Sequence, residues 1–161
     1  MVDTLTATKR SEVMAKVGSK DTRPELLIRK TLHARGFRYR LHVKDLPGKP
    51  DLVFPQYKSV IQINGCFWHG HKCPRCRMPN TNIEYWERKI ARNVERDASN
   101  LQSLLEAGWR VMTIWECALT GKWKLELNQV IALASEWLYS TIAFCEISGK
   151  ANHIKNRATE S

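Results

Sequence analysis

The chain has 161 residues and a formal net charge of +10, because 26 lysines and arginines outnumber 16 aspartates and glutamates. This length favours a single domain, and a hydrophobic content of 43% with six tryptophans argues against a disordered protein. No apolar run approaches the roughly 18 residues of a membrane-spanning helix, and residues 1–20 lack the apolar stretch of a secretory signal, so we expect a cytoplasmic protein with no membrane partner.

Two helices are predicted in the N-terminal part of the chain. Residues 9–17 carry a small apolar face and are expected to form a short helix. The second helix begins at Thr22, a favoured N-cap residue, with Pro24 in its first turn and Glu25 as a capping-box partner. Gly36 is expected to end it.

Three strands are predicted next. Apolar side chains alternate with basic ones over residues 37–43, which is the period of a half-buried strand. The sequence Pro-Gly-Lys-Pro at residues 47–50 predicts a turn, and residues 51–54 and 58–64 are expected to pair as a hairpin.

The second half continues the alternation of helix and strand. Residues 65–81 show little periodicity and predict a loop, whereas residues 82–107 form the longest helical pattern. An apolar strand at 109–115 and an amphipathic helix at 125–139 follow, and the polar segment from Cys145 onward predicts a flexible tail. This order predicts an α/β domain with a mixed sheet flanked by helices.

The positive charge is concentrated in the first hundred residues. Residues 1–60 carry 13 basic and 6 acidic side chains, residues 61–98 carry 7 and 4, and residues 99–161 carry 6 of each. Solubility alone does not require this asymmetry, whereas a face that binds a polyanion does. Nucleic acid is therefore the favoured partner.

Cysteines and histidines cluster around residues 66–76. Five cysteines, an odd number, do not suit a disulfide framework, and disulfides are rare inside cells. Zn²⁺ prefers four thiolate or imidazole ligands in a tetrahedron. Six candidates exceed that number: Cys66, His69, His71, Cys73, Cys76 and Cys117. The residues alone predict a zinc-stabilised loop and leave its ligand set open.

Asp51 follows Pro50 at the start of a strand, where metal-dependent nucleases place a Mg²⁺ ligand. In the common nuclease pattern the next strand supplies an acid and a lysine, but here it contains Gln62-Ile63-Asn64. Glu25 would supply the missing acid if its helix packs beside Asp51, and otherwise it is a plain capping residue.

Phe67 and Trp68 are adjacent aromatic residues in the polar loop. Two interpretations remain open for them. They pack on the metal site as a buried anchor, or they form a wedge that enters a stack of DNA bases, since aromatic faces stack well and apolar wedges unstack duplex DNA.

Several short strings carry a resemblance to a known family: PGKPD at 47–51, NGCFWH at 64–69 with His71 and Cys73, KI at 89–90, NVERD at 93–97, GWRV at 108–111 and WECAL at 115–119. With these strings the chain resembles the very short patch repair (Vsr) endonucleases over about residues 8–140. It departs from a known member at Ile63 and Asn64, which replace threonine and histidine, and at Cys76, an additional thiol.

The resemblance implies a restriction-endonuclease-like fold and an enzyme that nicks one DNA strand 5′ to the thymine of a T·G mismatch. Such mismatches arise by deamination of 5-methylcytosine. The implied partners are double-stranded DNA with a T·G mismatch, mismatch-repair proteins and, through function, a DNA cytosine methyltransferase. The implied state is a monomer associated with the bacterial nucleoid.

The resemblance also implies roles for individual residues. Asp51 and the main-chain carbonyl of Ile63 would bind the catalytic Mg²⁺, His69 would be the general base, and Glu25 a supporting acid. The implied ligands of a structural Zn²⁺ are Cys66, His71, Cys73 and Cys117, and the implied DNA contacts are Met14, Phe67 and Trp68.

We accordingly expect a DNA-contacting arm at residues 1–20, an endonuclease domain at 21–144 and a polar tail at 145–161. Two alternatives remain: a zinc-stabilised DNA-binding module without catalysis, and a nuclease of the same fold with a different DNA target.

Overall fold

A six-stranded mixed sheet, in the order β1 to β6, forms the centre of the molecule. The computed structural model describes residues 22–74, 76–150 and 155–156, so the predicted helix at 9–17 and Met14 lie outside the described residues. β3, β4 and β5 run parallel, and the other neighbouring pairs are antiparallel. The strands are β1 (Arg40–Leu41), β2 (Leu52–Phe54), β3 (Ser59–Asn64), β4 (Arg110–Trp115), β5 (Phe144–Ile147) and β6 (Lys155–Asn156).

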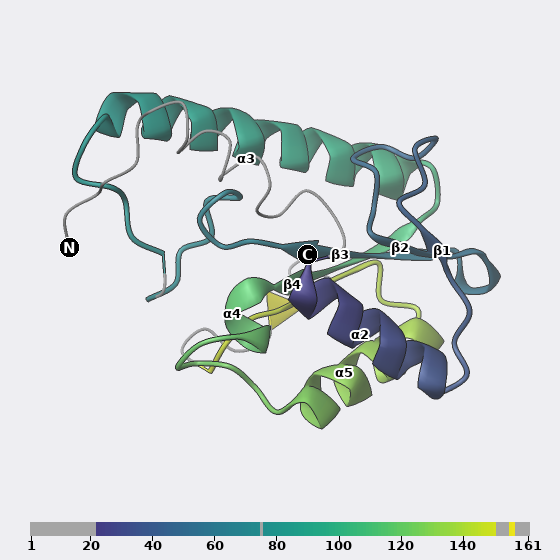
Figure 1. Cartoon of the computed structure of the whole chain (residues 1–161). Helices are drawn as coiled ribbons and strands as arrows, with labels where there is room; N and C mark the ends of the chain where they lie inside the picture. The colour runs from purple at the N-terminus through teal and green to yellow at the C-terminus, as the bar shows by residue number, and fades with distance from the viewer. Residues whose placement is uncertain (1–21, 75, 151–154, 157–161) are drawn as a thin grey trace.

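Helices cover both faces of this sheet (Figure 1). α3 (Ile83–Glu106) crosses one face, and α2 (Arg23–Ala34) and α5 (Leu127–Tyr139) pack together on the other. The short α4 (Glu116–Leu119) follows β4 directly. This arrangement confirms the predicted α/β fold with a mixed sheet flanked by helices, as in restriction endonucleases. Within the described residues, no helix has the length and apolar character needed to cross a bilayer.

Alternation along the strands divides the core into two layers, because successive side chains of a strand point to opposite faces. Val53 and Val60 pack with Leu104 of α3. The neighbouring Leu52 and Ile61 face the other way, in a cluster that includes residues of α2 and α5. The predicted hairpin of residues 51–64 is therefore confirmed, with antiparallel pairing of β2 and β3.

The start and end of α2 also agree with the sequence. Thr22 caps the helix, and its hydroxyl oxygen accepts a hydrogen bond from the backbone N–H of Glu25 (3.4 Å). After the helix, Gly36 adopts a left-handed conformation (φ +97°) that costs glycine little. The carboxylate of Glu25 points away from the cap, toward the edge of the sheet described below.

The predicted half-buried strand at residues 37–43 is wrong in extent. Only Arg40 and Leu41 pair with β2, and both side chains are exposed. Phe37 instead packs into the core against the ring of Phe54, and His42 has a positive φ of 47°, which interrupts an extended strand.

The predicted polar tail from Cys145 is also wrong where the structure describes it. Phe144–Ile147 forms β5 beside β4, and the side chains of Cys145 and Ile147 are buried. The strand has only four residues, one of them charged, which is too short for its hydrophobic pattern to predict a strand. Their strand exists because β4 offers an open edge on which they pair.

Candidate active site and metal cluster

The candidate site lies at one edge of the sheet. The parallel strands β3 and β4 end there together, with Asn64 opposite Trp115. Asp51 precedes β2, and because β2 runs antiparallel to β3 its beginning lies at this same edge. The loop after β3 and the helix α4 after β4 therefore start beside Asp51.

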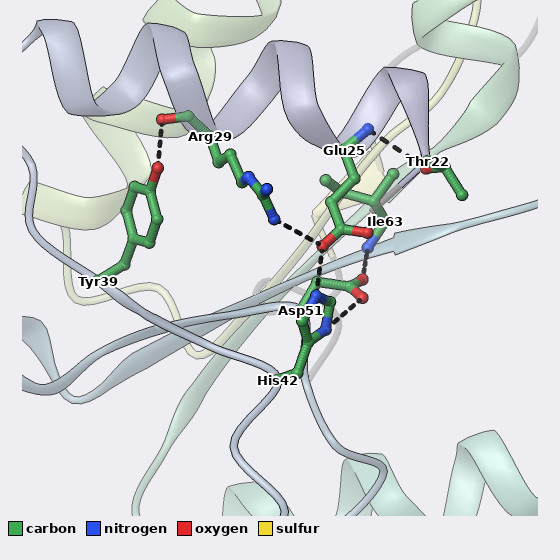
Figure 2. Close-up of polar contacts among 7 residues, drawn as sticks. All are labelled: Thr22, Glu25, Arg29, Tyr39, His42, Asp51 and Ile63. Atoms are coloured by element: carbon green, nitrogen blue, oxygen red, sulfur yellow. Dashed lines mark hydrogen bonds and ion pairs between the residues drawn. The ribbon is translucent and has the colours of Figure 1, made fainter. Parts of the chain in front are cut away.

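Glu25, His42 and Asp51 converge at this edge from α2, the end of β1 and the start of β2 (Figure 2). The carboxylate oxygen Oδ2 of Asp51 accepts a hydrogen bond from the N–H of Ile63 (2.7 Å). His42 lies between the two acids, with Nε2 3.0 Å from Glu25 Oε1 and Nδ1 3.8 Å from Asp51 Oδ1. The structure thus brings Glu25 beside Asp51, as the second-acid interpretation requires. A donor atom from each of the three lies within 4.8 Å of the others.

Burial dominates the electrostatics of Asp51. The pKa of Asp51 is raised to about 6, mainly by removal from water and also by the negative charge of Glu25. The N–H of Ile63 and the positive charges of His42 and His69 act in the opposite direction. A half-buried carboxylate that is costly to ionise is suited to bind a cation, because the cation compensates the charge.

His69 is held by Asp97, a residue for which the sequence predicted no role. Nδ1 of His69 lies 2.6 Å from Oδ2 of Asp97 on α3. In neutral His69 this contact favours a proton on Nδ1 and leaves Nε2 as an acceptor. The available signal was the NVERD string itself, because Asp97 is its last residue.

One face of α3 positions the whole segment around His69. The side-chain amide of Asn93 donates to the carbonyl of Trp68 (2.9 Å), one helical turn before Asp97. Gly70 packs so closely on the helix that an added Cβ would lie 2.6 Å from Val94 Cγ2. The contacts from Asn93, Val94 and Asp97 connect the NGCFWH loop to the NVERD segment of α3.

Four of the six candidate zinc ligands come together. The donor atoms of Cys66, His71, Cys73 and Cys117 all lie within 4.8 Å of one another. The imidazole of His71 also stacks on Trp115, with ring centroids 4.1 Å apart. Two thiols are buried and the other two donors are half-buried, so the group forms a closed cluster at the start of α4.

The two candidates outside this cluster have other contacts. His69 faces Asp97, and the thiol of Cys76 donates to the carbonyl of Cys66 (3.8 Å). Burial raises the pKa of the Cys76 thiol, and what separates Cys76 from the four clustered residues is its position. The geometry therefore groups four of the six candidates and leaves the other two outside that group.

The electrostatics of the cluster favour a cation. Hydrogen bonds from the Cys66 thiol and from His71 lower the pKa of Cys117 to about 4, and the backbone N–H of Gly149 also donates to its sulfur (3.2 Å). The same contact with Cys117 raises the pKa of Cys66. Soft thiolate and imidazole donors at such separations suit tetrahedral Zn²⁺.

Phe67 and Trp68 form an aromatic cluster with Trp86 of α3, at ring-centroid distances of 5.3 to 5.8 Å. All three side chains are half-buried rather than enclosed. The ammonium group of Lys89 lies 5.3 Å from the centroid of the Trp68 ring. In the sequence Trp86 is only one apolar helix position among several, so its place beside the loop is a result of the tertiary structure.

Comparisons with known proteins agree with this geometry. The family described as DNA mismatch endonuclease Vsr matches residues 2–75. The DNA mismatch endonuclease Vsr of Escherichia coli is 37% identical over 154 residues, covering 96% of this chain and 99% of the relative. The type II nicking enzyme V.NmeAIP of Neisseria meningitidis is 48% identical over 122 residues, 76% of this chain and 87% of the relative. V.XorIIP of Xanthomonas oryzae, also a type II nicking enzyme, is 45% identical over 126 residues, 78% of this chain and 93% of the relative.

A sheet edge with two adjacent acids, an oriented histidine and a Cys/His cluster thus occurs in a chain whose relatives are named as nicking or mismatch endonucleases. The chain belongs to the Vsr family of DNA mismatch endonucleases and is an endodeoxyribonuclease.

Proposed function

We propose that this endonuclease nicks one DNA strand 5′ to the thymine of a T·G mismatch, the product of 5-methylcytosine deamination. The observation that carries the proposal is the placement of the buried carboxylate of Glu25 and the half-buried carboxylate of Asp51 at the same edge of the sheet as the His69–Asp97 pair. Relatives named as mismatch or nicking endonucleases support it.

His69 is the general base in this proposal. Its Nε2 accepts a proton from the water that attacks the phosphorus, while Nδ1 faces Asp97. The carboxylate of Asp97 keeps the ring oriented and stabilises the imidazolium that forms. Asp97 is a positioning residue, because it acts through His69.

The carboxylates of Asp51 and Glu25 and the main-chain carbonyl of Ile63 would hold Mg²⁺, a hard cation that prefers oxygen ligands. The two acids fit such an ion because Glu25 is 2% exposed and the pKa of Asp51 is raised. When bound, Mg²⁺ would supply Lewis-acid stabilisation of the charge that develops on the phosphate and on the leaving backbone oxygen as the bond from phosphorus to that oxygen breaks.

Zn²⁺ has a structural role in the proposal. Cys66, His71 and Cys73 belong to the loop that carries His69, and Cys117 belongs to α4. A closed set of four protein ligands leaves no position for substrate, which is typical of structural zinc. The metal would join the loop to the end of β4.

Mismatch selectivity would come from the aromatic cluster. Phe67 and Trp68 would enter the base stack from one groove, with Met14 of the arm at residues 1–20 entering from the other. Unstacking costs a few kcal/mol per step and least at a weak mispair. Trp86 and Lys89 belong to the same surface and would contact the adjacent base and phosphate.

The biological setting is part of the proposal: a monomer associated with the bacterial nucleoid, a link to a DNA cytosine methyltransferase, and contact with mismatch-repair proteins. The strand-specific repair of deaminated 5-methylcytosine requires a methylated site before the nick and resynthesis after it.

The test is a nicking assay with duplexes that contain each mismatch in a randomised context, with and without Mg²⁺. We expect Mg²⁺-dependent cutting of one strand, 5′ to the thymine of T·G. Cutting of matched DNA at a defined sequence would favour a same-fold nuclease with another target. Tight mismatch binding without any nicking would favour a zinc-stabilised binding module. Cutting that survives Asp51→Ala would contradict the assigned metal site.

A further inference from the structure

His42 is a part of the carboxylate cluster that the proposed mechanism does not use. It follows β1 and has a left-handed backbone (φ 47°), a conformation in which histidine is one of the enriched residue types. Its backbone N–H donates to the carbonyl of Asp51 (3.2 Å). The backbone thereby fixes His42 beside Asp51 and directs the imidazole toward both acids (Figure 2).

The separation between His42 and Glu25 matches that of adjacent ligands around one small cation. Nε2 of His42 lies 3.0 Å from Oε1 of Glu25, and Nδ1 lies 3.8 Å from Oδ1 of Asp51. Adjacent ligands of an octahedral ion with bonds of about 2.1 Å are about 3 Å apart. The contact between His42 and Glu25 has this spacing, and one donor atom from each of the three residues lies within 4.8 Å of the other two. Three separate segments therefore place donor atoms around one position.

Glu25 provides an independent indication that this position suits a cation. Its side chain is 3% exposed, and its Oε1 is shielded from solvent. Although His42 and Arg29 contact this oxygen, it accepts no hydrogen bond of good geometry from the described residues. A buried carboxylate oxygen without such a bond is costly unless a cation compensates it.

We propose that His42 is a nitrogen ligand of the catalytic divalent cation, together with Asp51 and Glu25. This inference rests on the proposed function, because it concerns the metal of the same site. An imidazole ligand favours transition metals, whereas an all-oxygen site favours Mg²⁺. The mixed site of this chain therefore binds Mn²⁺ in preference to Mg²⁺.

The experiment uses the full-length, zinc-loaded protein with Mn²⁺ as the probe and no DNA. Pulsed electron paramagnetic resonance detects a nitrogen bound directly to Mn²⁺, and titration gives the Mn²⁺ and Mg²⁺ affinities. Glycine tolerates the positive φ of residue 42. In His42→Gly we therefore expect the nitrogen signal to disappear and the ratio of Mn²⁺ affinity to Mg²⁺ affinity to fall about tenfold. His42→Asn, which also tolerates a left-handed backbone, should give the same result.

His33→Gln is the matched control, since His33 is an exposed histidine on α2. It should keep both the nitrogen signal and the metal preference. Bound Mn²⁺ without a nitrogen signal, a signal that persists in His42→Gly, or no Mn²⁺ binding would each overturn the proposal. Zinc content and melting curves identify a variant that fails to fold. If one His42 variant fails to fold, the other one tests whether His42 is the nitrogen ligand.

Failure of this proposal is distinguishable from failure of the proposed function. If the protein shows the nitrogen signal but does not nick T·G duplexes, His42 is a metal ligand and the proposed function is wrong. If the protein nicks T·G duplexes with Mg²⁺ but shows no nitrogen signal, the proposed function holds and the assignment of His42 as a ligand is wrong.

Discussion

At Asp51, stability and activity are expected to oppose each other. The carboxylate is needed as an anion for a metal, yet burial favours its neutral form and raises its pKa from 3.8 to about 6. Between these two values the folded protein binds more protons than the unfolded chain. The contribution of Asp51 to stability is therefore present below about pH 4 and is lost as the pH rises through 6.

Asp51→Asn tests this linkage. Without added Mg²⁺, the variant should gain stability relative to the original protein as the pH rises from 4 to 7, by at most about 3 kcal/mol. It should also lose Mg²⁺-dependent nicking. Denaturant unfolding of both proteins at a series of pH values measures the difference and cancels effects that they share. If the free energies of unfolding of the two proteins change with pH in parallel, Asp51 is not desolvated in solution.

A second residue-scale prediction concerns Asp97. Asp97→Asn keeps the size of the side chain but allows His69 to present the wrong ring nitrogen, so kcat should fall by about 100-fold or more. Affinity for a T·G duplex should stay unchanged, because the proposed DNA contacts are elsewhere. Glu95→Gln is the control, as Glu95 is exposed on the same helix. A loss of affinity equal to the loss of kcat would argue against a positioning role.

At the scale of elements, the loop after β3 depends on two supports from distant parts of the chain. α3 contacts it through Asn93, Val94 and Asp97, and the Cys/His cluster joins it to α4. Gly149 supports the cluster from beyond β5, where an added Cβ would lie 2.7 Å from the carbonyl oxygen of Cys117. Few apolar contacts would hold such a loop alone.

Cys73→Ala should therefore remove the metal and the loop geometry together. We expect zinc content to fall from about one equivalent to near zero, with a lowered melting temperature and loss of nicking. Cys76→Ala is the matched control, because Cys76 lies outside the group of four, and it should retain zinc. Elemental analysis of both purified variants checks this, and zinc loss only in Cys76→Ala would reverse the ligand assignment.

At the scale of the molecule, the charge of +10 is divided unevenly between a basic first part and a neutral last third. The basic part contains the sheet edge and the aromatic cluster, with Lys89 over the ring of Trp68. The neutral part contains α5, which covers one face of the sheet, and β5, which extends the sheet beyond β4. This division predicts one DNA-binding face.

DNA affinity should accordingly fall steeply with salt, with a log–log slope of about −4 to −7 for five to eight phosphate contacts. Lys89→Gln should make the slope less negative by about 0.9. Lys122→Gln is the matched control, because Lys122 also lies over a tryptophan, at 5.7 Å from the Trp123 ring, but in the neutral third. Fluorescence anisotropy at several salt concentrations measures the salt slope for both variants. A DNA affinity that does not change with salt would indicate that the positive charge serves solubility alone.

Local patterns predicted much of this fold. The cap at Thr22, the hairpin that forms β2 and β3, the long α3 and the apolar β4 all agree with the sequence. These features depend on neighbouring residues, through periodicity, capping and turn chemistry, so a sequence contains the information directly. The Cys/His loop and the family strings are likewise short, contiguous patterns that the chain displays directly.

Tertiary structure decided the rest. Only the edge of β4 makes a strand of residues 144–147, and only the packing of α3 brings Asp97 to His69. The turn to positive φ at His42 ends β1 early and sends an imidazole between two acids from other segments. Each of these depends on contacts between residues far apart in the chain, which no local pattern encodes. The sequence by itself determined the kind of protein and the residue types for its chemistry, and packing determined which of them meet.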